Sequence, residues 1–178
     1  MSIQLKPERG GFLRPFGCGW FIREFLMGRG PEGSPAIDPE AGATQADINY
    51  AYKEALARAT ARERAEIVIS NMVTRGADVT DEEADDIYQR ELRKISRKFT
   101  HMRYHSFLVY FGVLKRLGWV EETGQTERSA IQDNYAPAPE RVYYRLTKRG
   151  MKARDESWSN PLFTLYPEIG LNHRKKSD

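Results

Sequence analysis

The stretch SFLVYFGVLKRLGWVEETG, residues 106–124, and the stretch RVYYRLTKRG, residues 141–150, decide the fold. The first predicts a helix over residues 102–117 that stops at Gly118 and is followed by a strand beginning near Val120. In the second stretch, apolar positions alternate with basic or polar ones, which is typical of a strand with one buried face. Together the two stretches predict a helix followed by a two-stranded hairpin.

The alternation in the second strand assigns its two faces. Val142, Tyr144 and Leu146 fall on one face, which we expect to belong to the core. The intervening positions form a face that we expect to be basic and directed to solvent: Arg141, Tyr143 and Arg145.

Three threonines upstream have an acid three residues later, the pattern of a helix-capping box. Thr44 predicts one helix, and Thr80 predicts another that begins acidic and ends basic near Lys98. Thr60 leaves two alternatives open, a restart or one helix of roughly 30 residues that ends at Gly76. Downstream, Thr147 predicts a cap for a short helix over residues 148–158.

Composition and charge narrow the class of protein. The chain has 178 residues, 40% of them apolar and 11% aromatic, which suits one core. Its net charge is only +3, but the charge is unevenly distributed. Residues 77–91 hold seven acids, whereas residues 92–120 hold seven Lys or Arg and no acid, and residues 141–154 are also free of acids. Such basic runs are typical of a surface that meets phosphates.

The remaining features favour a cytoplasmic protein. Cys18 is the only cysteine, so no intrachain disulfide forms. The N-terminal arm, residues 1–18, is interrupted by charges, glycines and prolines, and no apolar run approaches the length of a membrane span. We therefore expect neither a signal peptide nor a membrane anchor.

In this order, the elements resemble the winged helix-turn-helix regulators of the broad MarR and PadR kind. Residues 113–121, VLKRLGWVE, are similar to the end of a recognition helix and the first wing strand, and residues 141–150 are similar to the second wing strand and the next helix. The resemblance implies a mainly α fold with a small β wing. It also implies a single domain over residues 1–178, with extra helices inserted.

The helices can be matched to that fold in two ways. We favour residues 20–27 and 44–59 as the first two helices, because a short helix, a loop and a capped helix suit the family. The domain then divides into first helices at 19–60, a helical insertion at 61–100, a recognition helix, wing and following helix at 101–158, and a tail at 159–178. The alternative takes residues 62–75, 81–98 and 102–117 as the three helices. The long terminal dimerising helix of PadR-like chains is missing, and the inserted helices are candidates to replace it.

The resemblance implies that the helix at 102–117 enters the major groove of double-stranded DNA. The residues that it places near base edges lie at the start of this helix: His101, Arg103, Tyr104, His105 and Ser106. Those that it places near phosphates flank them: Lys94, Arg97, Lys98, Lys115 and Arg116. The wing loop holds one base, Arg128, so Arg141 and Arg145 on the wing face are the better phosphate contacts.

No other chemistry is expected from the sequence. His101 and His105 are four residues apart but lack a companion at the spacing of a zinc site. No nucleophile, base and acid form a recognisable set, so we expect no enzyme, no metal and no cofactor. The expected partners are DNA and a second copy of the chain, in a symmetric homodimer that pairs through the inserted helices. The alternative is a winged-helix module for protein contact in a replication, plasmid-maintenance or viral assembly, which the aromatic third helix and the weakly basic wing favour.

Overall fold

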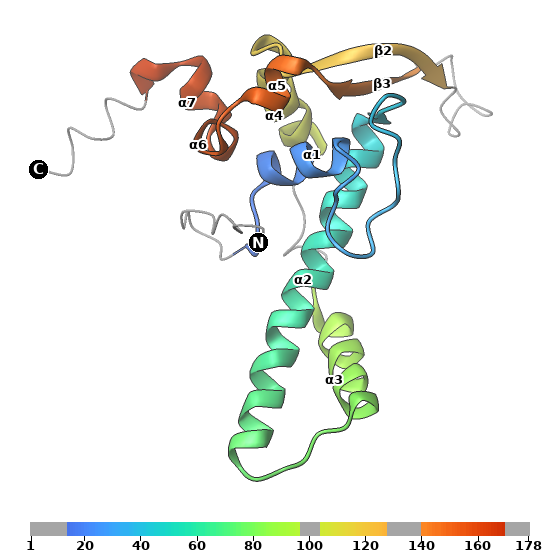
Figure 1. Cartoon of the computed structure of the whole chain (residues 1–178), viewed down its shortest axis with the longest axis vertical. Helices are drawn as coiled ribbons and strands as arrows, with labels where there is room; N and C mark the ends of the chain where they lie inside the picture. The colour runs from blue at the N-terminus through green and yellow to red at the C-terminus, as the bar shows by residue number, and fades with distance from the viewer. Residues whose placement is uncertain (1–13, 97–103, 128–139, 170–178) are drawn as a thin grey trace, which may run out of the picture.

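The computed structural model describes residues 14–96, 104–127 and 140–169, with only the backbone of Tyr104 and His105. Within them the helices are α1 (Cys18–Leu26), α2 (Gln45–Thr74), α3 (Asp81–Lys94), α4 (Tyr104–Arg116), α5 (Lys148–Lys152), α6 (Asp155–Ser159) and α7 (Pro161–Leu165). The strands are β1 (Ala43–Thr44), β2 (Val120–Glu127) and β3 (Arg141–Leu146). A mainly helical fold with a small sheet is thereby confirmed (Figure 1).

The sheet is antiparallel and has β3 in its centre, in the order β1-β3-β2. Val120 of β2 lies opposite Leu146, and Ala43 of β1 lies opposite Tyr144. Tyr144 and Leu146 are buried, which confirms the core face predicted from the alternation. The two-residue strand β1 was not predicted, and by pairing with β3 it joins the start of α2 to the β2–β3 hairpin.

The core lies where α1, α2 and α4 meet the sheet. Phe21 of α1 and Tyr52 of α2 are fully buried, with ring centroids 5.3 Å apart. Phe111 of α4 meets Tyr144 of β3 edge to face at 5.0 Å. Burial of one such ring contributes about 1.5–3 kcal/mol, so this aromatic cluster fixes how α4 sits on the sheet.

Helix α2 runs through Thr60 without a break, which selects the single long helix of the two alternatives. Its second half leaves the core and pairs with α3 as a helical hairpin that projects from the body (Figure 1). The two helices are in contact, and Ala61 and Ala65 of α2 and Ile87 of α3 are buried. Gly76, in the left-handed conformation at φ +87°, follows the end of α2 as predicted.

Two predicted helix boundaries were wrong. Helix α3 ends at Lys94 and not near residue 98, because Ile95 is extended at ψ 115°. The helix predicted over residues 148–158 is broken into α5 and α6 by an extended Ala153. The break turns Trp158 back onto Trp119, with centroids 4.6 Å apart, and its indole N–H donates to the Gly150 carbonyl at 3.0 Å. Packing of this buried indole outweighs the continuation of a short helix.

Candidate nucleic-acid interface

Helix α4 presents one face to the core and the opposite face to solvent. Phe107, Phe111 and Leu114 are fully buried. On the outer side Ser106 is exposed and Val109 is 60% exposed. The buried apolar residues of this helix recur at helical spacing and so lie on one side of it. The opposite, outer face is left uncovered by the rest of the described chain.

Two cationic residues lie in the last turn of α4. Lys115 and Arg116 are both exposed. The Lys115 ammonium donates to the Tyr144 hydroxyl at 3.3 Å and lies 5.2 Å from the centroid of that ring. Arg116 Nη1 donates to the Tyr166 hydroxyl at 3.2 Å. Both partners are phenol hydroxyls and not carboxylates, so the two side chains are oriented without an ion pair in the described part of the chain.

The two arginines of β3, Arg141 and Arg145, form ion pairs with carboxylates. Arg145 bonds two carboxylates at 2.9 Å each, those of Glu40 and Glu121. Arg141 lies 3.5 Å from Glu127, whose carboxylate also accepts from the Tyr143 hydroxyl at 2.9 Å and thereby raises the pKa of Tyr143. The face expected to be an open basic surface is therefore a row of ion pairs, and phosphates would have to compete with these glutamates.

A further group of cations follows β3 and was not included in the predicted site. All four are exposed, and none forms an ion pair within the described part of the chain: Lys148, Arg149, Lys152 and Arg154. The acid-free run 141–154 was the sequence signal for them. Thr147 holds this segment beside the end of α4, since its hydroxyl donates to the Gly118 carbonyl at 2.6 Å and its N–H to the Trp119 carbonyl at 3.0 Å.

The structure brings some of the predicted residues together and leaves others outside its description. Ser106, Lys115 and Arg116 lie on α4, and Arg141 and Arg145 lie on the sheet. Tyr104 and His105 form the first turn of α4, with side chains outside the description. Lys94 ends α3 and forms an ion pair with Glu91 at 2.6 Å. The remaining predicted contacts lie outside the described residues: Arg97, Lys98, His101, Arg103 and Arg128.

The described residues show little other reactive chemistry. Cys18 is buried, and burial raises the pKa of its thiol from 9.0 to about 12. Burial also raises the pKa of the Tyr52 and Tyr110 hydroxyls. In the ranges with described side chains, no group of three or more His, Cys, Asp or Glu residues is placed to hold a metal ion. Among the described helices, none has the length and apolar character needed to cross a bilayer.

Comparison with known proteins yields no match to a protein-family model, to a curated protein or to a solved structure. The interface therefore rests on its own geometry: the uncovered face of α4, the two oriented cations at its end, and the cationic segment that follows β3.

Proposed function

We propose that this chain is a DNA-binding protein of the winged helix-turn-helix kind, a transcriptional regulator that inserts α4 into the major groove. The observation that carries the proposal is the order α1, β1, α2, α4, β2, β3 together with the sheet order β1-β3-β2. This succession of helix, strand, two helices and a hairpin is the one expected of a winged helix. The projecting α2–α3 hairpin is then an insertion between the second and third helices of the motif.

The distribution of charge supports the same proposal. Lys115 and Arg116 flank the uncovered face of α4, and the cations of the segment after β3 lie beside its C-terminal end. Cations around a groove-reading helix contact phosphates and set its position, whereas side chains along the helix read the bases. The basic sequence run 92–120 leads into the start of α4 and adds to this charge.

We further propose that the protein acts as a symmetric dimer that pairs through the α2–α3 hairpin. One recognition helix reads only a few base pairs, so two-fold pairing over a palindrome supplies the remaining affinity. Helix α3 has acids in its first turn and basic residues in its last, Arg93 and Lys94. An antiparallel two-fold pair of such helices sets the acidic end of each against the basic end of the other.

A salt titration of binding to duplex DNA, followed by fluorescence anisotropy, tests the proposal. Lys115→Ala and Arg116→Ala should each reduce the slope of log K against log salt by about 1, because each removes one phosphate contact. Arg29→Ala is the matched control, since Arg29 is exposed in the loop after α1, outside both the hairpin and the proposed DNA contacts, and should leave the slope unchanged. Binding that does not respond to salt would contradict the proposal.

A second candidate function is a winged-helix module for contact with another protein. The observation that favours it is the 60% exposed Val109 on the uncovered face of α4, together with wing arginines that are already paired. Retention on heparin and on random duplex DNA at low salt separates the two functions. Size-exclusion chromatography with light scattering then gives the oligomeric state. A chain that fails to bind any duplex even at low salt belongs to the second class.

A further inference from the structure

The middle of the outer face of α4 is apolar. Between Ser106 at its start and Lys115 near its end, the residues on this face are Leu108, Val109 and Gly112. Val109 is 60% exposed, and the other two are partly exposed. At 100° per residue the three positions fall within about 100° of the helix circumference, opposite the side that is buried in the core.

The side chains in the middle of this face offer no hydrogen bond to a ligand. Tyr110 is the only polar residue between Ser106 and Lys115, and it points toward the core. Its hydroxyl would lie 2.6 Å from a Cβ added at Gly19 of α1. Any contact that the middle of the face makes with a base through side chains is therefore an apolar one.

Gly112 leaves a gap beside Val109. Nothing in the described part of the chain lies within 4 Å of a Cβ added at Gly112. Glycine weakens the interior of a helix, but the missing side chain lets another molecule approach the helix backbone closely. Val109 lies three residues earlier, on the same side of the helix, and borders this gap.

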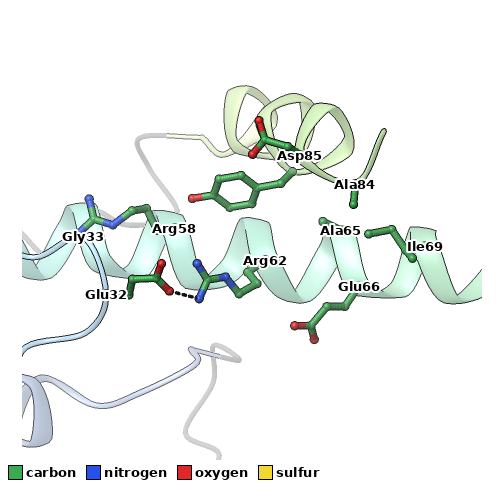
Figure 2. A pocket seen from close by; sticks show the side chains of 10 residues that line it. Glu32, Gly33, Arg58, Arg62, Ala65, Glu66, Ile69, Ala84 and Asp85 are labelled. Carbon is green, nitrogen blue, oxygen red and sulfur yellow. Dashed lines mark hydrogen bonds and ion pairs between the residues drawn. The ribbon is translucent and has the colours of Figure 1, made fainter. Parts of the chain in front are cut away.

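The pocket beside the α2–α3 hairpin has a different chemistry. It measures about 520 Å³ and is lined by charged side chains of α2, α3 and the loop that follows α1 (Figure 2). Glu32 and Arg62 form an ion pair there at 2.9 Å. The face of α4 instead sets an apolar patch next to the cations Lys115 and Arg116, so the two surfaces suit different ligands.

One feature of double-stranded DNA matches an apolar patch next to cations. In the major groove of unmodified DNA, the bases present hydrogen-bond donors and acceptors and a single apolar group, the C5 methyl group of thymine. Phosphates line both sides of the groove, within reach of cations that flank a helix placed in it. A helix with an apolar middle and a cationic end therefore complements a groove that carries thymine methyl groups.

We propose that Val109 recognises thymine by apolar contact with its C5 methyl group, so that the site bound by α4 carries thymine opposite this residue. The inference rests on the proposed insertion of α4 into the major groove. The gap at Gly112 lets the helix come close enough for the contact. Specificity at this position then comes from a buried methyl group and not from a hydrogen bond.

Replacing thymine by deoxyuridine tests this contact, because it removes the methyl group and keeps the charge and the hydrogen-bonding groups of the base. Fluorescence anisotropy compares a duplex rich in A·T pairs with the same duplex carrying deoxyuridine. The wild type should bind the thymine duplex about fourfold more tightly, the factor expected for burial of one methyl group. Val109→Ala should bring this ratio close to one and leave the salt slope unchanged, because no phosphate contact is lost.

Lys115→Ala is the matched control on the same helix. It should weaken binding to both duplexes by the same factor and keep the wild-type ratio, since a phosphate contact does not distinguish the bases. Equal binding of the two duplexes by the wild type would overturn the inference and leave the proposed function standing. A wild-type ratio in Val109→Ala would also overturn it, because the discrimination would then come from DNA shape. Failure to bind either duplex at low salt would overturn the proposed function and this inference together.

Discussion

Some glycines of this fold lie so close to neighbouring atoms that they leave no room for a side chain. A Cβ at Gly19 of α1 would overlap the Trp158 carbonyl oxygen of α6 and lie 2.6 Å from the Tyr110 hydroxyl. We predict that Gly19→Ala lowers the free energy of unfolding by about 1–3 kcal/mol, because backbone atoms must move apart. Gly112→Ala in α4 is the matched control, since nothing lies within 4 Å of its added methyl group.

The control substitution, Gly112→Ala, should change the free energy of unfolding in the opposite direction. An alanine in an open helical position should stabilise α4 by about 0.5–1 kcal/mol, because glycine loses more backbone entropy on folding. Urea unfolding of the two variants, followed by circular dichroism, measures both effects. Equal shifts for the two glycines would show that helix propensity, and not the contact with Trp158, determines the result.

The buried thiol leads to a second prediction at the residue scale. Because burial raises the pKa of Cys18 from 9.0 to about 12, the folded state favours the protonated thiol. Its contribution to stability is complete below about pH 9 and is lost as the pH rises toward 12. At pH 8 we expect a disulfide reagent to label the native chain far more slowly than the chain in guanidinium chloride. Equal labelling rates in the two states would contradict the burial of Cys18.

At the scale of an element, the hairpin depends on the cap of α3. The Glu83 N–H donates to the Thr80 hydroxyl at 3.2 Å, and the Thr80 N–H donates to the Glu83 carboxylate at 3.0 Å. Thr80→Ala removes half of this capping box and should destabilise α3 by about 1 kcal/mol. Thr74→Ala is the control, because Thr74 is exposed and bonds only the Ser70 carbonyl of its own helix, at 2.8 Å.

Hydrogen exchange shows which elements lose stability in Thr80→Ala. Amides of α3 should exchange about fivefold faster in Thr80→Ala, while those of α1 and β3 keep their wild-type rates, since the hairpin packs apart from the main core. Uniformly faster exchange over the whole chain would instead show that hairpin and body unfold as one unit.

Elements specified by neighbouring residues were predictable from the sequence. The caps at Thr44, Thr80 and Thr147 and the buried face of β3 depend on local hydrogen bonds and on alternation, and all are confirmed. Strand β1 was not predictable, because two residues carry no periodicity and are held by pairing with a strand about 100 residues later. The continuity of α2 through Thr60 was not predictable either, because Thr60 and Glu63 have the same spacing as the caps at Thr44 and Thr80.

The candidate site was only partly predictable for the same reason. The exposed cations of α4 follow from the helical period of its apolar residues. The ion pairs of Arg141 and Arg145 do not, because Glu40 and Glu121 reach Arg145 from different parts of the chain.

At the scale of the whole molecule, the proposed binding of DNA should depend on the balance of charge on the β2–β3 hairpin. The ion pairs of β2 and β3 place Glu127 and Glu121 beside Arg141 and Arg145, so under the proposed function we expect each of these acids to oppose the approach of a phosphate. We predict that Glu121→Gln strengthens binding to duplex DNA, because it removes one repulsive charge and releases one of the two carboxylates from Arg145. The gain should be about twofold to fivefold at low salt, the scale of one exposed pair, and should shrink as added salt screens it. Glu54→Gln, an exposed site on the first half of α2, outside the α2–α3 hairpin, should leave the affinity unchanged. Fluorescence anisotropy at two salt concentrations separates the outcomes: weaker binding by Glu121→Gln would mean that the glutamate positions Arg145 for the phosphate instead of competing with it.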